Sequence, residues 1–497
     1  MNFYSTRGDK TAASAAYAIK CGLAKDGGLY MPERIPTLTE DEIQKIKEMS
    51  YPERAAHIIG KFLTDYTYEE LLEDAKAAYS VEKFGSQPAP VTKFTDKVGV
   101  LELWHGPTSA FKDMALQIMP RLFVRALKMT GEDKCALILV ATSGDTGKAA
   151  LEGYRDVPGT KIQVFYPTDG VSRVQKLQMQ TQEGKNVKVL AIRGNFDDAQ
   201  SGVKRIFADE KMKATLAEAG VFLSSANSIN WGRLVPQIVY YVSAYCDMMC
   251  QGAITFGEKL DVCVPTGNFG NIFACYIAKL MGLPIGKLIC ASNSNNVLTD
   301  FLKCGTYDRN RHFFKTISPS MDILISSNLE RLLFLICGAE KTAAYMKELS
   351  ENGKYTLDAA DFEKIKESFV GYYTDEEMTK ATIYDAYKNK NCLIDTHTAV
   401  AVCAAEQYMN TYKTERKMLV VSTASPYKFA KDVYLSLEGE DKARLFDDDA
   451  EAIGALEALS GVTAPMPLKA VTAKKIIHSD IIDIKDMDRA VISFTEN

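Results

Sequence analysis

The feature that most constrains the fold is a run of alternating strand and helix patterns from about residue 135 onward. Short aliphatic runs bounded by small or polar residues alternate with longer amphipathic segments. Buried strands separated by helices favour an α/β protein with a mainly parallel sheet. The aliphatic runs are 134–142, 161–167, 186–192, 221–226, 259–266, 287–293 and 415–425. Ligands of such sheets bind at the carboxyl ends of the strands, and the polar loops of this chain follow these runs.

Residues 1 to about 95 have a different, mostly helical pattern. Thr39 is a candidate N-cap for a segment with apolar residues at helical spacing, and 66–80 has the same spacing. A Pro-rich stretch at 84–94 marks a boundary. A later segment, 340–390, is charged, rich in tyrosine and helical in pattern.

The size and charge of the chain exclude several functional classes. Its 497 residues favour two or three domains. The net charge of −5 and the lack of a long basic run disfavour binding to nucleic acid or to anionic membranes. The 11 cysteines lack a CxxC pair, which indicates reduced thiols and no zinc site. Because no signal segment or run of roughly 18 apolar residues is present, we expect a cytoplasmic protein without a membrane partner.

A lysine stands at a loop-to-helix junction in HGPTSAFKD, residues 105–113. Gly106-Pro107-Thr108 predicts a tight turn, and the residues after Lys112 have a helical pattern. Side chains at such junctions are often aimed at ligands. In a partly desolvated pocket a lysine loses its proton more readily and becomes a nucleophile toward an aldehyde.

The loop PTGNFGN, residues 265–271, follows an aliphatic run and opens a helix. Gly267 and Gly270 allow the backbone to turn tightly and to approach a ligand. The helix N-terminus behind them suits a phosphate, and the amides of Asn268 and Asn271 can add donors. The pattern is not GxGxxG, so a dinucleotide site is unsupported. A plain turn explains the spacing equally well.

The loop ATSGDTGK, residues 141–148, has the same strand-to-helix context. It is not a nucleotide P-loop, because Thr142 stands where that motif has its first glycine and Ala149 stands where it has Ser or Thr. It predicts a second anion site, small enough for a carboxylate. A helix start with Asp145 as an ordinary cap is an equal alternative.

The loop SANSINWGR, residues 225–233, is rich in hydrogen-bonding side chains, among them Asn227, Ser228 and Asn230. Arg233 falls in the first turn of the following helix, where a cation does not favour the helix dipole. A bound anion would justify it, although a surface arginine without a partner is the simpler interpretation.

The remaining polar candidates give weaker signals. In STASPYKF, Ser422 or Thr423 could donate to a ring nitrogen or cap a turn. His105 and His397 lack a nucleophile at a recognisable spacing. The Asp-x-His pattern at 395–397 could form half of a metal site but is more often structural, so no metal is predicted.

Together these loops supply a phosphate site, a lysine amine and a hydroxyl for a ring nitrogen, which are what pyridoxal phosphate requires. The chain also resembles the threonine synthases of the long microbial and fungal form, in the same order and over nearly its whole length. The motifs are YSTRG, KDGGLYMPE, HGPTSAFKD, SGDTG, SANSIN, PTGNFGN, PSMDILISSNLERLLF and STASPYKF. HGPTSAFKD together with PTGNFGN is the most specific part.

The resemblance implies an α/β enzyme of pyridoxal-phosphate fold type II, similar to the tryptophan synthase β subunit, with parallel-sheet lobes and a helical N-terminal domain. It implies an N-terminal threonine-synthase domain at 1–95 and a catalytic region at 96–497, with a smaller lobe nested at about 135–225. The implied reaction converts O-phospho-L-homoserine and water to L-threonine and phosphate, the last step of threonine biosynthesis.

Residue roles also follow from the resemblance. Lys112 would bind the cofactor covalently and then act as the general base. The cofactor would be held by Gly267, Asn268, Phe269, Gly270 and Asn271 at its phosphate, Thr423 at its ring nitrogen and Asp145 near its phenolic oxygen. The substrate would be held by Thr142, Ser143 and Gly144 at its carboxylate, and by Thr146, Asn227, Ser228 and Arg233 at its phosphate.

One departure and three alternatives accompany this interpretation. The family often reads STAHPAKF in the last motif, whereas this chain has Ser425 and Tyr427. An O-phosphohomoserine phospholyase would release 2-oxobutanoate from the same substrate. A serine or threonine dehydratase would have no use for Arg233, and a protein that binds its ligand without turnover would not need Lys112. The family's long form implies a monomer or a weak homodimer.

Overall fold

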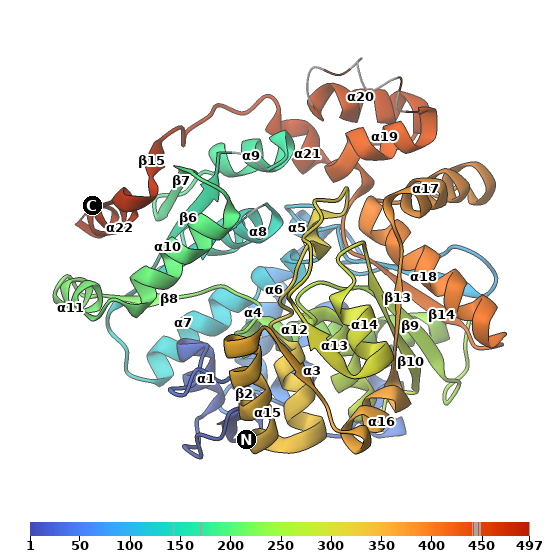
Figure 1. Ribbon diagram of the computed structural model, residues 1–497, viewed down its shortest axis with the longest axis horizontal. Coiled ribbons are helices and arrows are strands. Elements are labelled where there is room, and N and C mark those ends of the chain that lie inside the picture. Colours follow the sequence, from blue (N-terminus) through green and yellow to red (C-terminus); the bar gives the residue numbers. More distant parts are fainter. Residues whose placement is uncertain (143, 169–170, 440, 442–445, 447–448, 497) are drawn as a thin grey trace.

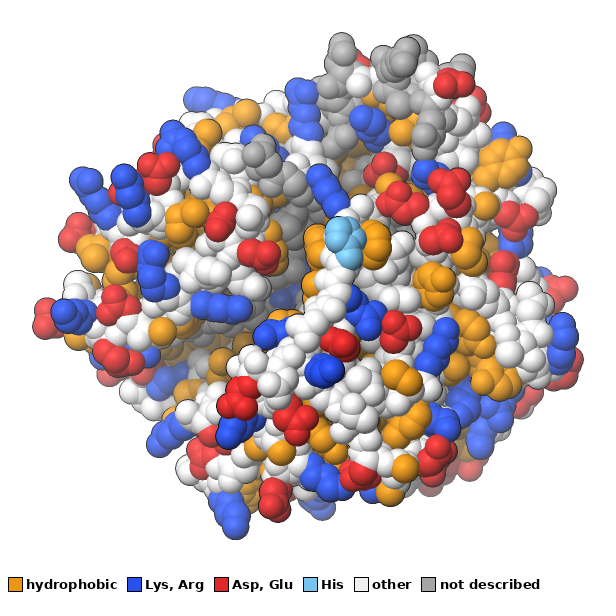
Figure 2. All heavy atoms as spheres, viewed as in Figure 1, with side chains coloured by type: hydrophobic (Ala, Val, Ile, Leu, Met, Phe, Trp, Pro, Cys, Tyr) orange, Lys and Arg blue, Asp and Glu red, His pale blue; other side chains and the backbone are white. Residues whose placement is uncertain are grey.

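The computed structural model describes residues 1–142, 144–168, 171–439, 441, 446 and 449–496, with two parallel-rich sheets and a helical N-terminal segment (Figure 1). On the face seen in Figure 2, a furrow runs between the lobe at the left and the rest of the molecule. No helix within these ranges is long and apolar enough to cross a membrane.

The N-terminal segment is mostly helical, as its sequence predicts. Its elements are β1 (Phe3–Ser5), α1 (Ala15–Cys21), β2 (Tyr30–Pro32), α2 (Glu40–Lys47), α3 (Tyr51–Gly60), α4 (Tyr68–Ala78) and α5 (Val81–Phe84). Thr39 caps α2: its hydroxyl accepts the N–H of Glu42, whose carboxylate accepts the N–H of Thr39. The predicted N-cap is therefore confirmed.

The larger sheet has the strand order β13-β10-β9-β14-β4-β3. All its neighbours are parallel except β3 and β4, which are antiparallel. The strands are β3 (Val91–Lys93), β4 (Val98–Glu102), β9 (Leu260–Pro265), β10 (Ile285–Ser292), β13 (Phe369–Tyr373) and β14 (Met418–Ser422).

Alternate residues of these strands face two separate hydrophobic cores, as the two-residue period of a strand requires. On β14, Leu419 and Val421 belong to one core and Val420 belongs to the other. Helices α12 (Trp231–Cys250) and α13 (Gly270–Leu280) supply the first core, and α18 (Thr396–Tyr412) supplies the second. Burial on both faces explains the unbroken aliphatic runs in the sequence.

The smaller sheet has the strand order β15-β7-β6-β5-β8, and all its neighbours are parallel. Its strands are β5 (Cys135–Ala141), β6 (Thr160–Pro167), β7 (Val187–Arg193), β8 (Val221–Ser224) and β15 (Ile481–Asp483). Helices of this lobe are α7 (Met119–Met129), α8 (Asp145–Tyr154), α9 (Arg173–Gln180), α10 (Phe196–Ala208) and α11 (Glu210–Glu218). The C-terminal strand β15 therefore returns to a sheet built mostly from the middle of the chain.

The remaining elements complete the second half of the chain. They are α14 (Val297–Cys304), β11 (Thr306–Asp308), η1 (Pro319–Met321), α15 (Leu329–Asn352), β12 (Lys354–Thr356), α16 (Ala359–Ser368), α17 (Glu376–Lys390), η2 (Pro426–Phe429), α19 (Ala430–Glu438), α20 (Asp449–Ser460), α21 (Met466–Val471), η4 (Ile484–Asp486) and α22 (Met487–Glu496). The α/β class with mainly parallel sheets is confirmed.

Candidate active site

The turn that precedes Lys112 is locked by the residue that follows it. The Asp113 carboxylate accepts the N–H of Thr108 at 2.7 Å and the hydroxyl of Thr108 at 2.8 Å. Gly106 makes this possible, since a Cβ there would lie 2.6 Å from the Asp113 Cβ. Burial raises the pKa of Asp113 to about 6. Lys112 is thereby fixed at the start of α6 (Asp113–Leu116), at the predicted loop-to-helix junction.

Lys112 lies among buried polar groups and is itself only 11% exposed. Its Nζ is 3.7 Å from Asp145 Oδ2 and 3.5 Å from the Ser320 hydroxyl. Burial lowers its pKa to about 8; the Asp145 carboxylate opposes this shift, and the Arg233 and Lys428 cations add to it. A lysine with this pKa is a competent nucleophile near neutral pH.

Asp145 is the acidic centre of the site. It is the first residue of α8, and Gly144 occupies the cap position, so the ordinary-cap interpretation is wrong. One carboxylate oxygen lies 2.9 Å from Lys428 Nζ and accepts Gln175 Nε2–H at 2.8 Å. Burial alone would raise the pKa of Asp145, but the Lys428 and Lys112 ammonium groups hold it well below the usual range. Asp145 is therefore a fixed anion between two lysines.

The predicted phosphate loop, residues 265–271, connects β9 to α13 as expected. Phe269 is the helix cap and has φ of +65°, an uncommon value for a residue with a side chain. A Cβ on Gly267 would lie 2.8 Å from the Ser320 carbonyl oxygen, so this position needs glycine. The first turn of α13 leaves backbone N–H groups without helical partners, which suits an anion.

Side chains around this loop hold its shape. The backbone N–H and Nδ2–H of Asn328 both donate to the Asn268 carbonyl at 3.1 Å. The Asn271 side chain points toward α12, where its Oδ1 accepts the hydroxyls of Tyr240 and Tyr241 at 2.6 Å each. Its buried Nδ2 has no partner among the described residues. Asn271 therefore faces the loop with its backbone rather than with its carboxamide oxygen.

The 141–148 loop is closed by its own side chain. The Thr142 hydroxyl accepts the N–H groups of Gly144 and Gly147 at 3.0 Å each. A Cβ on Gly144 would lie 2.6 Å from the Gln175 side chain, so a larger residue does not fit. Thr146 is half-buried on the first turn of α8, whereas Ser143 lies outside the described residues.

Arg233 is buried, 5% exposed, so the interpretation as a surface arginine is wrong. Its guanidinium donates to the Ala226 carbonyl at 2.8 Å and has no salt bridge to a described carboxylate. Burial lowers its pKa to about 10. A buried guanidinium without an anion carries a desolvation penalty that a ligand anion would offset.

The other residues of the 225–233 loop have separate environments. Asn227 is exposed, while the Ser228 hydroxyl accepts Asn328 Nδ2–H at 3.3 Å. Asn230 is used by the fold, because its side chain caps α12 and donates to the Ile19 carbonyl at 2.8 Å. Asn328 therefore joins Ser228 to the phosphate loop.

The two hydroxyls at the end of β14 differ. The Ser422 hydroxyl accepts hydrogen bonds from Trp104 Nε1 and Thr398, both at 2.9 Å. Thr423 is buried, and its carbonyl accepts the N–H of Phe111, one residue before Lys112, at 2.8 Å. Of the two, Thr423 is the candidate for a ring nitrogen.

The two unusual residues of the last motif have structural contacts. Ser425 caps η2, and its N–H donates to the Ser109 carbonyl at 3.1 Å. The Tyr427 hydroxyl contacts the Ser460 hydroxyl at 3.0 Å and donates to the Val462 carbonyl. Tyr427 thus points to the C-terminal segment.

Two functional candidates were not predicted from the sequence: Lys428 and Ser320. Lys428 is fully buried, and its Nζ also donates to the Thr108 carbonyl at 2.7 Å. His397 Nε2 accepts the Ser320 N–H at 3.1 Å, while its Nδ1 lies 2.8 Å from Asp395 Oδ2. His397 therefore positions Ser320 beside Lys112. Lys428 and Ser320 both lie inside motifs that the sequence analysis quoted, and this position was the sequence feature that could have indicated a role for them.

Matches to known families cover most of the chain. Residues 2–79 match the threonine synthase N terminus, residues 90–424 match the pyridoxal-phosphate dependent enzymes, and residues 398–463 match the threonine synthase C-terminal family. The chain belongs to the threonine synthase family. It is a pyridoxal-phosphate-dependent enzyme, so the cofactor predicted from the sequence is confirmed.

Relatives within the threonine synthase family include human threonine synthase-like 1, 40% identical over 452 residues that cover 88% of this chain and 60% of that protein. The threonine synthase of Pseudomonas aeruginosa is 38% identical over 442 residues, covering 87% of this chain and 90% of that protein. The chain thus spans about 60% of the length of the human relative.

A solved structure extends the likeness to the whole fold. The pyridoxal-phosphate-bound threonine synthase from Brucella melitensis matches with a TM-score of 0.87 at 33% identity, and all of each chain is covered. The predicted fold class, type II with parallel-sheet lobes, is confirmed.

Proposed function

We propose that this enzyme is a threonine synthase that converts O-phospho-L-homoserine and water to L-threonine and phosphate. The observation that carries the proposal is Arg233, a buried guanidinium that has no carboxylate partner in the described part of the chain. It is close enough to Lys112 for its charge to lower the pKa of that lysine. An amine for the cofactor and a separate phosphate site are what a phosphorylated amino acid substrate needs.

The arrangement also fits the cofactor. Lys112 supplies the amine, and the N-terminus of α13 supplies backbone donors to the cofactor phosphate from Gly267, Asn268, Phe269, Gly270 and Asn271. Thr423 would donate to the ring nitrogen, and Asp145 would lie near the phenolic oxygen. When bound, pyridoxal phosphate supplies an electron sink for negative charge that develops at the substrate α and β carbons.

Protons are moved by Lys112. Because burial keeps its pKa near 8, its amine is partly neutral at physiological pH and can take the proton from the substrate Cα. Asp145 and Ser320 hold the Lys112 Nζ in place, at 3.7 Å and 3.5 Å. The anchored ammonium can return a proton after phosphate has left.

Substrate anions are held by two loops. Thr142, Ser143 and Gly144 form the loop proposed for the carboxylate, and the Thr142 hydroxyl closes this loop by accepting the N–H groups of Gly144 and Gly147. Thr146, Asn227, Ser228 and Arg233 bind the phosphate, which departs as an anion stabilised by the guanidinium. Two lysines beside the Asp145 carboxylate, and Arg233 near enough to Lys112 to lower the pKa of that lysine, give the site the positive charge that a phosphate dianion requires.

A second candidate is an O-phosphohomoserine phospholyase, which would release 2-oxobutanoate. Ser425 and Tyr427 stand where the family often has His and Ala, so any role of that His is missing from this chain. Both activities use Lys112 and Arg233, and they differ only in whether water is added at Cβ.

Product analysis separates these functions. The cofactor-loaded enzyme is incubated with O-phospho-L-homoserine, the carbon product is identified by NMR, and phosphate release is followed in parallel. Threonine in equal amount to phosphate supports the synthase. Phosphate with 2-oxobutanoate selects the phospholyase, and no phosphate release contradicts both.

A further inference from the structure

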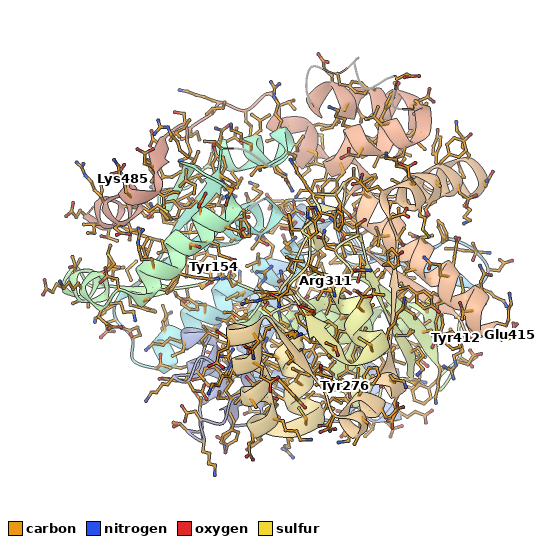
Figure 3. All side chains as sticks on the ribbon, viewed as in Figure 1. Tyr154, Tyr276, Arg311, Tyr412, Glu415 and Lys485 are labelled. Carbon is orange, nitrogen blue, oxygen red and sulfur yellow. The ribbon has the colours of Figure 1, made fainter. Side chains whose placement is uncertain are left out.

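A basic pocket of about 180 Å³ lies at the amino edge of the larger sheet, where β9, β10 and β14 begin. The candidate active site follows the carboxyl end of β9, so the length of that strand separates the two sites by about 20 Å. Glu415, the residue before the pocket's Arg416, is labelled at the right margin of Figure 3.

Four cations line this pocket: Lys259, Lys279, Lys287 and Arg416. They come from separate segments that meet only in the folded chain: the residues preceding β9 and β14, the last turn of α13 and the start of β10. The one acidic residue in the lining, Glu367, is exposed. The pocket therefore concentrates positive charge on a protein whose net charge is −5.

A buried carboxylate, Asp261, lies behind the lining of the pocket and already has hydrogen-bond partners. Asp261 accepts the N–H of Lys287 at 2.6 Å, an Arg416 N–H at 3.3 Å and the Tyr408 hydroxyl at 3.2 Å. A Cβ on Gly286 would lie 2.0 Å from Asp261 Oδ1, so glycine is required for this approach. Asp261 holds Arg416 in place and offsets part of the positive charge of Lys279 and Lys287, so that four cations in the lining face two carboxylates, Asp261 and Glu367.

Two of the lysines are tethered by the backbone. The Lys279 ammonium donates to the Gly286 carbonyl at 2.6 Å. The Lys287 ammonium donates to the carbonyls of Lys366 at 2.7 Å and Glu367 at 2.9 Å, at the end of α16. Burial lowers the pKa of both lysines, and neighbouring cations lower it further. Fixed cations that repel one another in a small pocket attract an anion.

We propose that this pocket is a second anion site, which binds a phosphate or phosphoryl group. Ammonium and guanidinium groups from four separate segments line the pocket, and several donors around one ligand match a tetrahedral oxyanion better than a planar carboxylate. The phosphoryl chemistry has two possible sources, free inorganic phosphate and a phosphate monoester. The proposal stands independently of the reaction at the carboxyl edge.

Equilibrium dialysis of the holoenzyme with inorganic phosphate tests it. The experiment uses the Arg233→Met protein, in which we expect phosphate binding at the candidate active site to be weakened. One phosphate per chain should still bind saturably. Lys287→Met and Lys259→Met should each weaken that binding about tenfold, the effect of losing one charge-assisted hydrogen bond. Lys259 is exposed and makes no hydrogen bond or ion pair to a described residue, so its replacement leaves the fold intact.

Lys347→Met is the matched control, since Lys347 is an exposed lysine of α15, and it should leave phosphate binding unchanged. Glycerol phosphate as a competitor distinguishes the sources: displacement indicates a phosphoryl group on a metabolite, and no displacement indicates free phosphate. The proposal is overturned if the Arg233→Met protein binds no phosphate, or if Lys347→Met weakens binding as much as Lys259→Met.

Discussion

The two edges of the larger sheet carry similar cations in different surroundings. At the carboxyl edge, Lys112 and Lys428 follow β4 and β14 and are nearly or fully buried beside Asp145, which follows β5 of the smaller sheet. At the amino edge the cations are half-buried or exposed. Burial strengthens electrostatic interactions, shifts pKa values and limits screening by salt. The carboxyl edge can therefore set protonation states for chemistry, whereas the amino edge offers charge for binding only.

The largest expected effect comes from removing the lysine that makes the carboxyl edge reactive. Lys112→Ala should abolish turnover and the visible absorbance of lysine-bound cofactor, while circular dichroism stays native. Lys347→Ala, an exposed lysine on α15, is the control and should change none of these. Full activity in Lys112→Ala would show that the catalytic centre lies elsewhere.

Lys428→Met should have the next largest effect, because it breaks a buried ion pair with Asp145 at 2.9 Å. Loss of one partner of a buried pair costs about 3–5 kcal/mol of folding free energy. The pKa of Lys112 should rise above its present value of about 8, since one repelling cation is removed and Asp145 is left to Lys112. Lys428→Arg should restore both the folding free energy and the pKa of Lys112.

The matched control for this variant is Lys148→Met, which also breaks a buried pair on α8, with Glu152 at 3.1 Å. It should lower the melting temperature without moving the pKa of Lys112. If both variants move the pH profile equally, the link between Lys428 and Lys112 is wrong.

A moderate effect is expected for the pH dependence of cofactor attachment. Only the neutral Lys112 amine attacks the cofactor aldehyde, so the rate of cofactor attachment to the apoenzyme should rise as pH passes about 8. An unperturbed lysine would require pH near 10.4. Stopped-flow absorbance across pH 6 to 11 measures the midpoint, and a midpoint near 10 would mean that Lys112 is solvated in the apoenzyme.

The smallest expected effect is the response to salt. Raising sodium chloride from about 0.05 M to about 0.5 M shortens the screening length severalfold. Phosphate binding at the amino edge should weaken much more than kcat/KM at the carboxyl edge, because its cations are accessible to solvent. Equal salt dependence of the two would remove the distinction between the edges.

Much of the fold could be predicted because local pattern and burial agree. The aliphatic runs that became β9 and β14 are buried on both faces, and the Gly-rich loop after β9 could only be a turn into a helix. The turn before Lys112 was predicted from Gly106 and Pro107. The hydrogen bonds by which Asp113 fixes this turn were not predicted.

Other parts of the fold could not be predicted, because they depend on pairing between residues that are far apart in the sequence. β13 lies in a segment with a helical, charged pattern and becomes a strand because it pairs with β10. The segment 196–220, amphipathic throughout, divides into two helices at Asp209, which caps the second. β15 joins the smaller sheet through contacts with β7 from nearly 300 residues earlier, roughly the separation of the paired residues Ile481 and Ala191.

Prediction of the candidate site was limited in the same way, by contacts between residues far apart in the sequence. Lys112 and the phosphate loop were predicted from local motifs, but the sequence favoured an exposed Arg233 that the structure buries. Lys428 meets Asp145 across a separation that no local pattern reveals, and only its position inside a quoted motif indicated it.

The most direct test of the central claim, that Arg233 holds the substrate phosphate, is the kinetics of Arg233→Met with O-phospho-L-homoserine. Arg205→Met, an exposed arginine of α10, is the control. We predict that kcat/KM falls about 10- to 100-fold, the worth of one charge-assisted contact, while the affinity for pyridoxal phosphate and its absorbance are unchanged. An unchanged kcat/KM, or an equal loss of cofactor affinity, would contradict the account.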